Sequence, residues 1–307
     1  MQDIRYIKLH IHLVMHEATT LPRHKASALR GGMGEMLLRM HCIRDRNCEA
    51  CDFETECLVR RTMYSKMEIQ PAFMSKGDSV GYVLECEDER EVFSEGDELV
   101  FHLLLFGKTI VYFSQFLQAI YQLGVHGLGK NKSTFSVKSI TNTTGEVILS
   151  GTDIAMDRVR VMYLSDYVEY RKRKLVADGP PYNLHLELRT PLSLKYRGEL
   201  QKEFHAEALM EACARRLYVL NCFEGIETEL TDIREHIPEI ARQEARPGSV
   251  KRYSSTHDEK IRLEGYYGAA DLTQIDETAL ELLIAGELIH IGKNTSFGFG
   301  RYQLTGV

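Results

Sequence analysis

A short loop that contains glycine and lysine occurs twice in this chain, and this repeat constrains the fold more than any other feature. The copies are GKNKS at residues 129–133 and GKNTS at residues 292–296. Each follows a segment with helical periodicity and precedes the last predicted strand of its half. An internal repeat fixes sequence and element order together. The repeat therefore indicates a duplicated fold.

The order of elements is the same in both halves. Apolar residues recur with period two in the predicted strands and at three and four in the predicted helices. The first half reads as strand 4–14, helix 24–40, strands 79–86 and 99–106, and helix 110–123, followed by residues 127–140, which contain the loop and then the last strand. The second reads as strand 183–188, helix 201–222, strands 250–255 and 260–267, helix 277–285, and a final strand. This order predicts an α+β protein of tandem ferredoxin-like, or RRM-like, βαββαβ domains.

The 307 residues are enough for two domains with separate cores. We place the first ferredoxin-like domain at residues 1–140, with a cysteine-rich insert at about 42–57 after its first helix. Residues 141–181, which end in Gly179 and two prolines, are interpreted as a connector. The second domain is placed at 182–307 and ends in the glycine-rich loop and last strand.

The charge of the chain is unevenly distributed. The net charge is −6, but residues 85–98 hold eight acidic residues and one arginine, a local −7, so the remainder sums to +1. A locally basic groove for nucleic acid is therefore allowed. No run of eighteen apolar residues indicates a membrane span, and the N-terminus does not resemble a signal peptide. We therefore expect a cytoplasmic protein.

Four cysteines lie within sixteen residues, with intervals of five, two and five residues between them: Cys42, Cys48, Cys51 and Cys57. In a cytoplasmic chain such a group favours metal over disulfides. The central pair suits one edge of a tetrahedral structural zinc site. An iron–sulfur cluster fits four thiolates equally well, and a segment without metal is a third interpretation.

The second loop continues into a strand through the sequence HIGKNTSFGFGRYQL, residues 290–304. Glycine suits a backbone with positive φ or a close approach, and consecutive N–H groups in such a loop bind phosphate oxygens. Lys293 would add a charge. The alternative interpretation is an ordinary turn before an edge strand.

Three stretches carry a resemblance to a known family: LRTPLSLKYRGEL (188–200), VKRYSSTH (250–257) and GELIHIGKNTSFGFGRYQL (286–304). With the two ferredoxin-like halves, they resemble the CRISPR-associated endoribonuclease that processes precursor CRISPR RNA, of the RAMP superfamily. LRGGMGEML (29–37) and the cysteine insert are similar to one branch. The resemblance implies metal-independent cleavage of CRISPR repeat RNA by the ribose 2′-OH, with 2′,3′-cyclic phosphate and 5′-OH products and no catalytic cofactor.

This chemistry needs a base near the 2′-OH and an acid near the leaving oxygen, which suits histidine. His24, at the start of the first helix, is the first candidate, because similar enzymes carry an active histidine there. Its alternative is a solvated helix-start residue. His290 adjoins the second loop but by alternation equally suits a position packed on the sheet. His257 is the third candidate, with a plain loop residue as its alternative.

RNA contacts are expected from both loops. The candidates are Lys293, Asn294, Ser296 and Arg301 in the second loop and strand, Lys130 and Lys132 in the first loop, and Arg252 and Tyr253 in the predicted strand 250–255. Phosphate contacts would position the strand, and Tyr253 could stack on an unpaired base. A core position is the alternative for Tyr253.

The sequence departs from the family pattern in two ways: the first loop lacks the trailing Gly-x-Gly, and the net charge is acidic. A second hypothesis is therefore a non-catalytic RAMP subunit that binds CRISPR RNA in an effector complex. A third is an interaction module in which the cysteine segment docks a partner protein. The sequence also leaves open a homodimer.

Overall fold

The computed structural model describes residues 4–48, 50–65, 67, 69–74, 79–151, 153–254 and 259–306. The chain divides into two compact units. The N-terminal unit comprises Arg5–Glu68 and Ala72–Met162, and the C-terminal unit comprises Met1–Ile4, Ile69–Pro71 and Tyr163–Val307.

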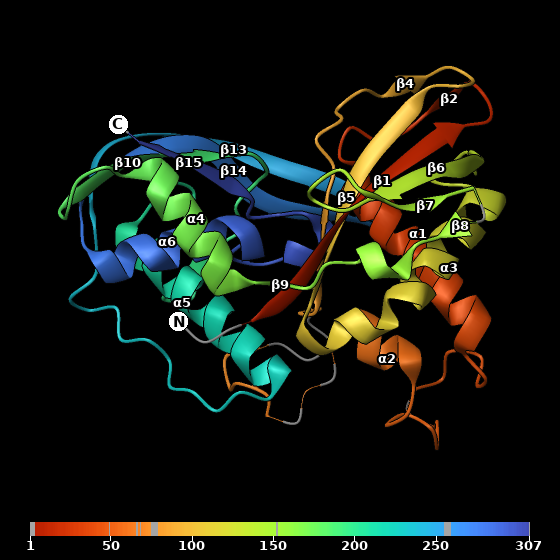
Figure 1. Cartoon of the computed structure of the whole chain (residues 1–307), viewed down its shortest axis with the longest axis horizontal. Coiled ribbons are helices and arrows are strands. Elements are labelled where there is room, and N and C mark those ends of the chain that lie inside the picture. The colour runs from red at the N-terminus through yellow and green to blue at the C-terminus, as the bar shows by residue number, and fades with distance from the viewer. Residues whose placement is uncertain are drawn as a thin grey trace. The chain divides into compact units, whose positions relative to one another are not determined.

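The N-terminal unit is an antiparallel sheet with helices on one face (Figure 1). Its elements are β1 (Arg5–Met15), β2 (Thr19–Thr20), α1 (Lys25–His41), α2 (Leu58–Met63), β3 (Tyr82–Glu85), β4 (Val92–Phe93), β5 (Glu98–Phe106), the 3-10 helix η1 (Gly107–Tyr112), α3 (Phe113–His126), β6 (Phe135–Thr141), β7 (Val147–Ser150), β8 (Asp153–Ile154) and η2 (Met156–Arg158). The strands run β3-β5-β1-β6-β7-β8 across the sheet, and β2 pairs separately with β4. The order β1-α1-β3-β5-α3-β6 is the predicted βαββαβ order.

The alternation in β1 decides which face of this sheet is covered. Ile7, Leu9, Ile11 and Leu13 join a core that also contains the buried residues of α1 and α3. Close packing of α1 on α3 explains Gly32, because a Cβ at this position would lie 2.6 Å from Leu123 Cδ1 of α3. The intervening residues of β1 therefore point to the opposite, helix-free face of the sheet.

The C-terminal unit repeats this architecture. Its elements are α4 (Leu164–Leu175), β10 (Tyr182–Leu188), β11 (Lys195–Tyr196), β12 (Glu199–Leu200), α5 (Ala206–Glu224), β13 (Glu239–Ser254), β14 (Glu259–Ile275), α6 (Glu277–Ile289), η3 (Thr295–Phe297) and β15 (Tyr302–Gly306), and the short strand β9 (Met162–Tyr163) lies at the boundary between the units. The sheet order is β13-β14-β10-β15, which matches β3-β5-β1-β6. The mixed α+β architecture with antiparallel sheets is thus confirmed.

Two parts of the fold differ from the sequence interpretation. Residues 141–181 were interpreted as a connector, but they contain β7 and β8, which extend the first sheet, and the helix α4. Leu164 and Val168 are buried, and Arg171 Nη2 lies 2.7 Å from Glu287 Oε1 on α6 and donates to Leu304 O. Within this segment, Arg171 therefore anchors α4 to α6.

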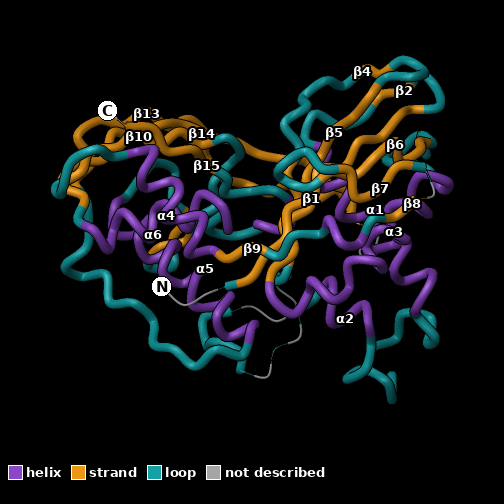
Figure 2. The backbone as a smooth tube through the Cα atoms, in the orientation of Figure 1, coloured by secondary structure: helices purple, strands orange, loops and turns teal. Residues whose placement is uncertain are grey.

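The second difference is the length of the β13–β14 hairpin, which Figure 2 shows as two long strands. The sequence predicted strands only at 250–255 and 260–267, whereas the strands have 16 and 17 residues. Residues 241–244 at the start of β13 are all exposed. Their polar sequence gives no alternating apolar signal, because an exposed strand is specified by backbone pairing rather than by burial. Among the described residues, no helix is both long and apolar enough to span a membrane.

Candidate nucleic-acid interface

Three segments of the N-terminal unit meet where the chain enters α1. Residues 16–25 lead into the helix, residues 85–93 belong to the acidic stretch, and residues 127–134 form the first glycine loop. His16 N donates to Thr134 O at 3.1 Å, and Leu21 N donates to Glu91 O at 2.8 Å. Asn131 Nδ2 donates to Thr20 Oγ1 at 3.1 Å. We call this meeting point the α1-entry site.

His24 is the N-cap residue of α1 and is half-buried. Burial lowers the pKa of its imidazole, and the neighbouring cations Arg23 and Lys25 lower it further, against the opposing effect of Glu89. A neutral imidazole keeps a lone pair that can accept a proton. The N-terminal end of a long helix also favours nearby negative charge. The position of His24 therefore suits a proton acceptor next to a phosphate.

Lys25, which was not among the predicted site residues, is fully buried directly after His24. Its Nζ donates to Asp88 O at 2.7 Å and to Arg90 O at 2.5 Å. Burial lowers the pKa of this ammonium, partly offset by Asp88. Lys25 thus fixes the acidic segment against the first turn of α1. A lysine directly after the expected active histidine was the signal that could have drawn attention to it.

The acidic segment also reaches the surface of the site. Arg23 Nε donates to Glu89 Oε2 at 3.0 Å, and both side chains are more than half exposed. An exposed ion pair of this kind contributes little to stability. It does place one carboxylate beside His24 and occupies one guanidinium of the α1-entry site.

The first glycine loop turns its two lysines outward. Lys130 and Lys132 are exposed, whereas Ser133 is buried and hydrogen-bonded to Thr19. Gly127 has φ +88°, and a Cβ there would lie 2.0 Å from Lys132 O, so only glycine permits this turn. The loop therefore holds two cations at the α1-entry site, as the sequence predicts for RNA contacts.

The second glycine loop is different, because its backbone is engaged within the C-terminal unit. Lys293 N donates to Ser193 O at 2.8 Å, and Gly300 N donates to Pro191 O at 2.9 Å. Phe297 N and Phe299 N both donate to Asn294 O. These amides are not available to a phosphate, so the expectation of a backbone phosphate cradle is wrong for them. The glycines serve close packing instead.

Among the side chains of this loop, only Lys293 is fully exposed. Asn294, at φ +64°, and Arg301 are partly exposed, whereas Ser296 is buried. Arg301 is also held through its backbone, where its N donates to Thr190 Oγ1 at 3.0 Å. The C-terminal loop can therefore offer RNA one exposed lysine with Asn294 and Arg301, but the burial of Ser296 does not fit the contact expected of it.

Of the other two catalytic candidates, His290 lies in the described part of the chain and His257 does not. His290 is completely buried at the end of α6, with its Nδ1 3.0 Å from Phe299 O. That position does not fit proton transfer to RNA, because no solvent or ligand reaches the ring; the packed alternative is the one observed. His257 lies outside the described residues. Arg252 and Tyr253 belong to β13, opposite Ile261 and Lys260, but their side chains also lie outside the description.

The described residues of the cysteine segment give no support to a metal site. Cys48 is exposed, and Cys42, Cys51 and Cys57 are partly exposed and free. Arg46 N donates to Cys42 Sγ at 3.2 Å. In the described chain, which omits residue 49, no group of three or more histidine, cysteine or acidic side chains is arranged to hold a metal. The zinc and iron–sulfur interpretations are therefore unsupported, because spacing limits only the chain length between thiolates, whereas a site needs all of them directed at one centre.

Together, the two βαββαβ units and the basic loop at the α1-entry site define a ferredoxin-like protein suited to nucleic acid. Comparison with known proteins gives the family. Residues 4–161, more than half of the chain, match the family model AF_1859_N, described as an N-terminal domain. Residues 186–302 match the model of the CRISPR-associated endoribonuclease Cas6. The chain therefore belongs to the family of the first model, and its residues 186–302 match the domain of a CRISPR-associated endoribonuclease.

Solved structures show the same fold. Thermus thermophilus Cas6 has a TM-score of 0.54 at 11% identity, with 99% of both chains covered. A Cas6 product complex also has a TM-score of 0.54, at 13% identity, with 97% of this chain and 99% of that chain covered. A partial Cas6-RT-Cas1–Cas2 complex reaches 0.61 at 13% identity; the alignment covers 99% of this chain but only 46% of that one. An uncharacterized protein of Archaeoglobus fulgidus is 24% identical over 293 residues, which is 92% of each chain.

Proposed function

We propose that this endoribonuclease cuts the repeat sequences of precursor CRISPR RNA without a metal ion. The ribose 2′-oxygen attacks the adjacent phosphorus as its proton passes to a base. The bond from phosphorus to the 5′-oxygen then breaks, and that oxygen receives a proton. The products carry a 2′,3′-cyclic phosphate and a 5′-OH.

The observation that carries this proposal is the half-buried His24 imidazole at the N-terminus of α1, together with a loop of two exposed lysines that is bonded to Thr20 in the segment leading into this helix. Because burial lowers its pKa, His24 is neutral at pH 7 and can accept the 2′-OH proton. Lys130 and Lys132 would stabilise the charge that develops on the phosphorane oxygens. Neither role needs a metal, and a 2′-OH nucleophile supplies its own oxygen.

Binding outside the reacting phosphate would come from polar and basic side chains of the second glycine loop and the strand after it. Lys293, Asn294 and Arg301 of the C-terminal unit are suited to phosphate contacts, which position RNA without reading its sequence. Arg252 and Tyr253 remain predicted RNA contacts. Each lost phosphate contact should weaken binding to all RNA sequences and reduce the salt dependence of the dissociation constant.

One observation favours a second function, a non-catalytic subunit that holds CRISPR RNA within a larger assembly. Arg23 is engaged by the exposed carboxylate of Glu89 next to His24. A carboxylate at this point opposes the approach of a phosphate to the imidazole. The structural similarity to a protein titled as part of a Cas6-RT-Cas1–Cas2 complex also makes an assembly with other CRISPR proteins a proposal to test.

A cleavage assay in a chelator separates the two functions. The substrate is RNA of the protein's own CRISPR repeat, and the same RNA with a 2′-deoxy residue at the scissile position is the comparison. We expect cleavage of the first RNA and none of the second. His24→Ala should reduce the rate by about 100-fold or more while RNA binding is retained. His41→Ala, a histidine at the opposite end of α1 from His24, is the matched control and should cut normally.

Each result has a definite meaning. If both RNAs stay intact while binding is tight, the subunit function replaces the enzyme. Cleavage of the 2′-deoxy RNA would exclude the 2′-OH mechanism. Normal cleavage by His24→Ala would remove His24 as the base.

A further inference from the structure

A row of four polar residues crosses the helix-free face of the N-terminal sheet, and the proposed reaction uses none of them. Glu85 on β3 lies opposite His102 on β5, His102 opposite His10 on β1, and His10 opposite Thr141 on β6. Residues directly opposite one another in antiparallel strands point to the same face. The four side chains therefore form one continuous line across four strands, which we call the histidine row.

Contacts within the row fix the orientation of its rings. His102 Nδ1 lies 3.1 Å from Glu85 Oε2, and because an ionised carboxylate only accepts, Nδ1 donates and Nε2 is left for a ligand. The rings of His10 and His102 lie 4.4 Å apart between centroids at an angle of 38°. The side chains of Glu85, His102 and His10 are therefore held in place by contacts with one another. The row is thus pre-arranged rather than a set of mobile surface groups.

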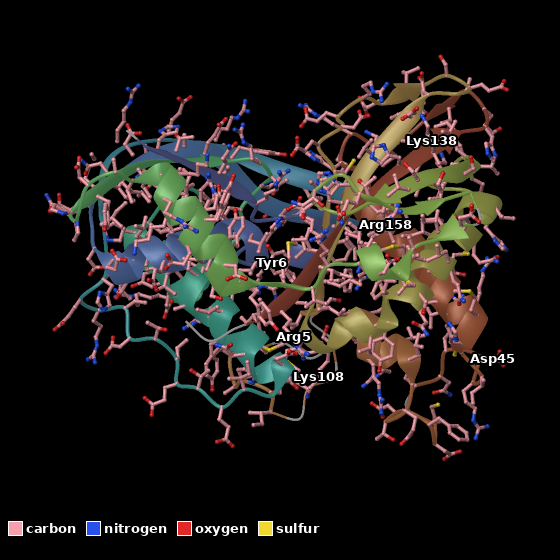
Figure 3. All side chains as sticks on the ribbon, in the orientation of Figure 1. Arg5, Tyr6, Asp45, Lys108, Lys138 and Arg158 are labelled. Atoms are coloured by element: carbon pink, nitrogen blue, oxygen red, sulfur yellow. The ribbon has the colours of Figure 1, made fainter. Side chains whose placement is uncertain are left out.

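The electrostatics of the histidine row do not suit a phosphate. Its neighbour Lys8 lies 2.7 Å from Glu85 Oε2, so this cation is already neutralised. Lys138 on β6, labelled in Figure 3, is likewise paired with Glu98 of β5. Burial, followed by the charges of His102 and Lys8, lowers the pKa of His10 to about 4, so His10 is neutral at pH 7.

Along β5, the two neighbours of His102 on this face are apolar. Val100 lies opposite His12, and Leu104 lies opposite Lys8, on either side of His102 along β5. The site therefore combines two imidazole faces, hydrogen-bonding groups at their edges and an apolar border. A flat, uncharged heteroaromatic group with polar edges matches each of these features.

We propose that the histidine row binds an unpaired nucleobase of the RNA, which stacks on the His10 ring and hydrogen-bonds through its edge to His102 Nε2 and the Thr141 hydroxyl. This inference rests on the proposed function, because the RNA substrate supplies the base. The sheet face would then add base recognition to the phosphate contacts of the loops. It would act on binding and on choice of repeat rather than on the chemical step.

The experiment measures the dissociation constant of repeat RNA, made uncleavable by a 2′-deoxy residue at the scissile position. A set of such RNAs carries one abasic residue at each unpaired position in turn. For the wild-type protein, we expect one or two abasic positions to weaken binding by about tenfold, as loss of a stacked base does. His10→Ala should bind the RNAs with those abasic positions as tightly as it binds the intact RNA. In this double-mutant cycle, the base and His10 make one contact with each other, and removal of either partner already abolishes it.

Two further variants guard against a folding artefact. His102→Gln keeps a donor toward Glu85 but removes the ring, so it should fold normally and still lose the abasic effect. His126→Ala, on α3 and away from this face, should behave as wild type throughout. An unchanged unfolding midpoint would show that each variant folds.

Three outcomes overturn the inference. One is that His10→Ala and His102→Gln keep the full abasic effect. Another is that they weaken all RNAs equally and reduce the salt dependence, which would make the row a phosphate site. The last is that no abasic position affects the wild type. If the wild-type protein cuts repeat RNA in any of these cases, only this inference fails; if it neither cuts nor binds repeat RNA, the proposed function fails with it.

Discussion

The ammonium of Lys25 donates to the carbonyl oxygens of Asp88 and Arg90 from a completely buried position in the first turn of α1. The nearest carboxylate oxygen, Asp88 Oδ1, is farther away at 3.9 Å. The Nζ also lies 5.3 Å from the centroid of the Phe93 ring. One side chain therefore joins the helix that begins at the proposed catalytic histidine to the most acidic segment of the protein.

Replacement of Lys25 by methionine tests this connection. Methionine fills the space of the stem but leaves the carbonyl oxygens of Asp88 and Arg90 without this donor, at a cost of about 1–3 kcal/mol each if water does not replace it. We expect Lys25→Met to lower the free energy of unfolding by about 2 kcal/mol in urea, with slower RNA cleavage because His24 is displaced. Lys132→Met, at an exposed lysine, is the control and should change stability by about 0.5 kcal/mol at most. Equal stability of the two variants would contradict an anchoring role.

The glycines of the second loop predict a steric effect that can be separated from backbone conformation. Gly300 has φ +73°, and a Cβ there would lie 1.8 Å from Ile291 O; Gly198 has φ +86°, with nothing within 4 Å. Gly198→Ala should therefore lose only about 1 kcal/mol of unfolding free energy, from its positive φ. Gly300→Ala should lose about 2 kcal/mol more, because the loop must move away from Ile291. Similar losses in both variants would show that close packing is not the reason for Gly300.

Stability should depend on the protonation of His10. Its pKa is about 4 in the folded protein against 6.5 for an ordinary histidine. Between these values, the unfolded chain binds a proton that the folded chain does not, so stability falls as pH falls from 6.5 to 4. Because the ring is only partly buried, we expect an effect on the order of 1 kcal/mol. The unfolding free energy of His10→Gln relative to that of wild type should therefore be about 1 kcal/mol higher at pH 4.5 than at pH 7.5. An equal difference at both values would exclude the lowered pKa.

The cysteines should differ sharply in reactivity. Cys48 is exposed, whereas burial raises the pKa of the Cys213 thiol to about 12. Because the thiolate is the reactive form, a thiol reagent at pH 8 should modify Cys48 in the folded protein and Cys213 only after unfolding. Mass spectrometry of the modified peptides measures both. Protection of Cys42, Cys48, Cys51 and Cys57 together until a chelator is added would contradict this result and support the metal site that the spacing suggested.

Both βαββαβ units could be predicted because their strands and helices bury one face each. Ile7, Leu9, Ile11 and Leu13 alternate in β1, and the core position of each follows from that period. The helix α4 and the long β13–β14 hairpin could not be predicted in the same way. Arg171 looks like a solvated charge until Glu287 is placed beside it, and Glu287 is 116 residues away. Pairing at that distance in sequence leaves no local pattern.

The sequence predicted only part of the candidate site, because it does not show which loop residues pack against distant segments. The two lysines of the first loop are exposed at the entry to α1, which suits the expected RNA contacts, whereas His290 and Ser296 are buried. Residues 290–304 contain the same residue types whether the loop faces RNA or packs on residues 191–193. Only the backbone hydrogen bonds from Lys293 and Gly300 distinguish the two arrangements.

The sequence by itself determined the duplicated element order, because hydrophobic periodicity and a repeated glycine–lysine loop are properties of short segments. The tertiary structure decided which polar residues meet. Glu85, His102, His10 and Thr141 come from four strands, and their alignment depends on strand register, which is fixed by the burial of the opposite face. The physical reason is that local sequence sets which face a side chain occupies, whereas its neighbours on that face are set by chain segments far away.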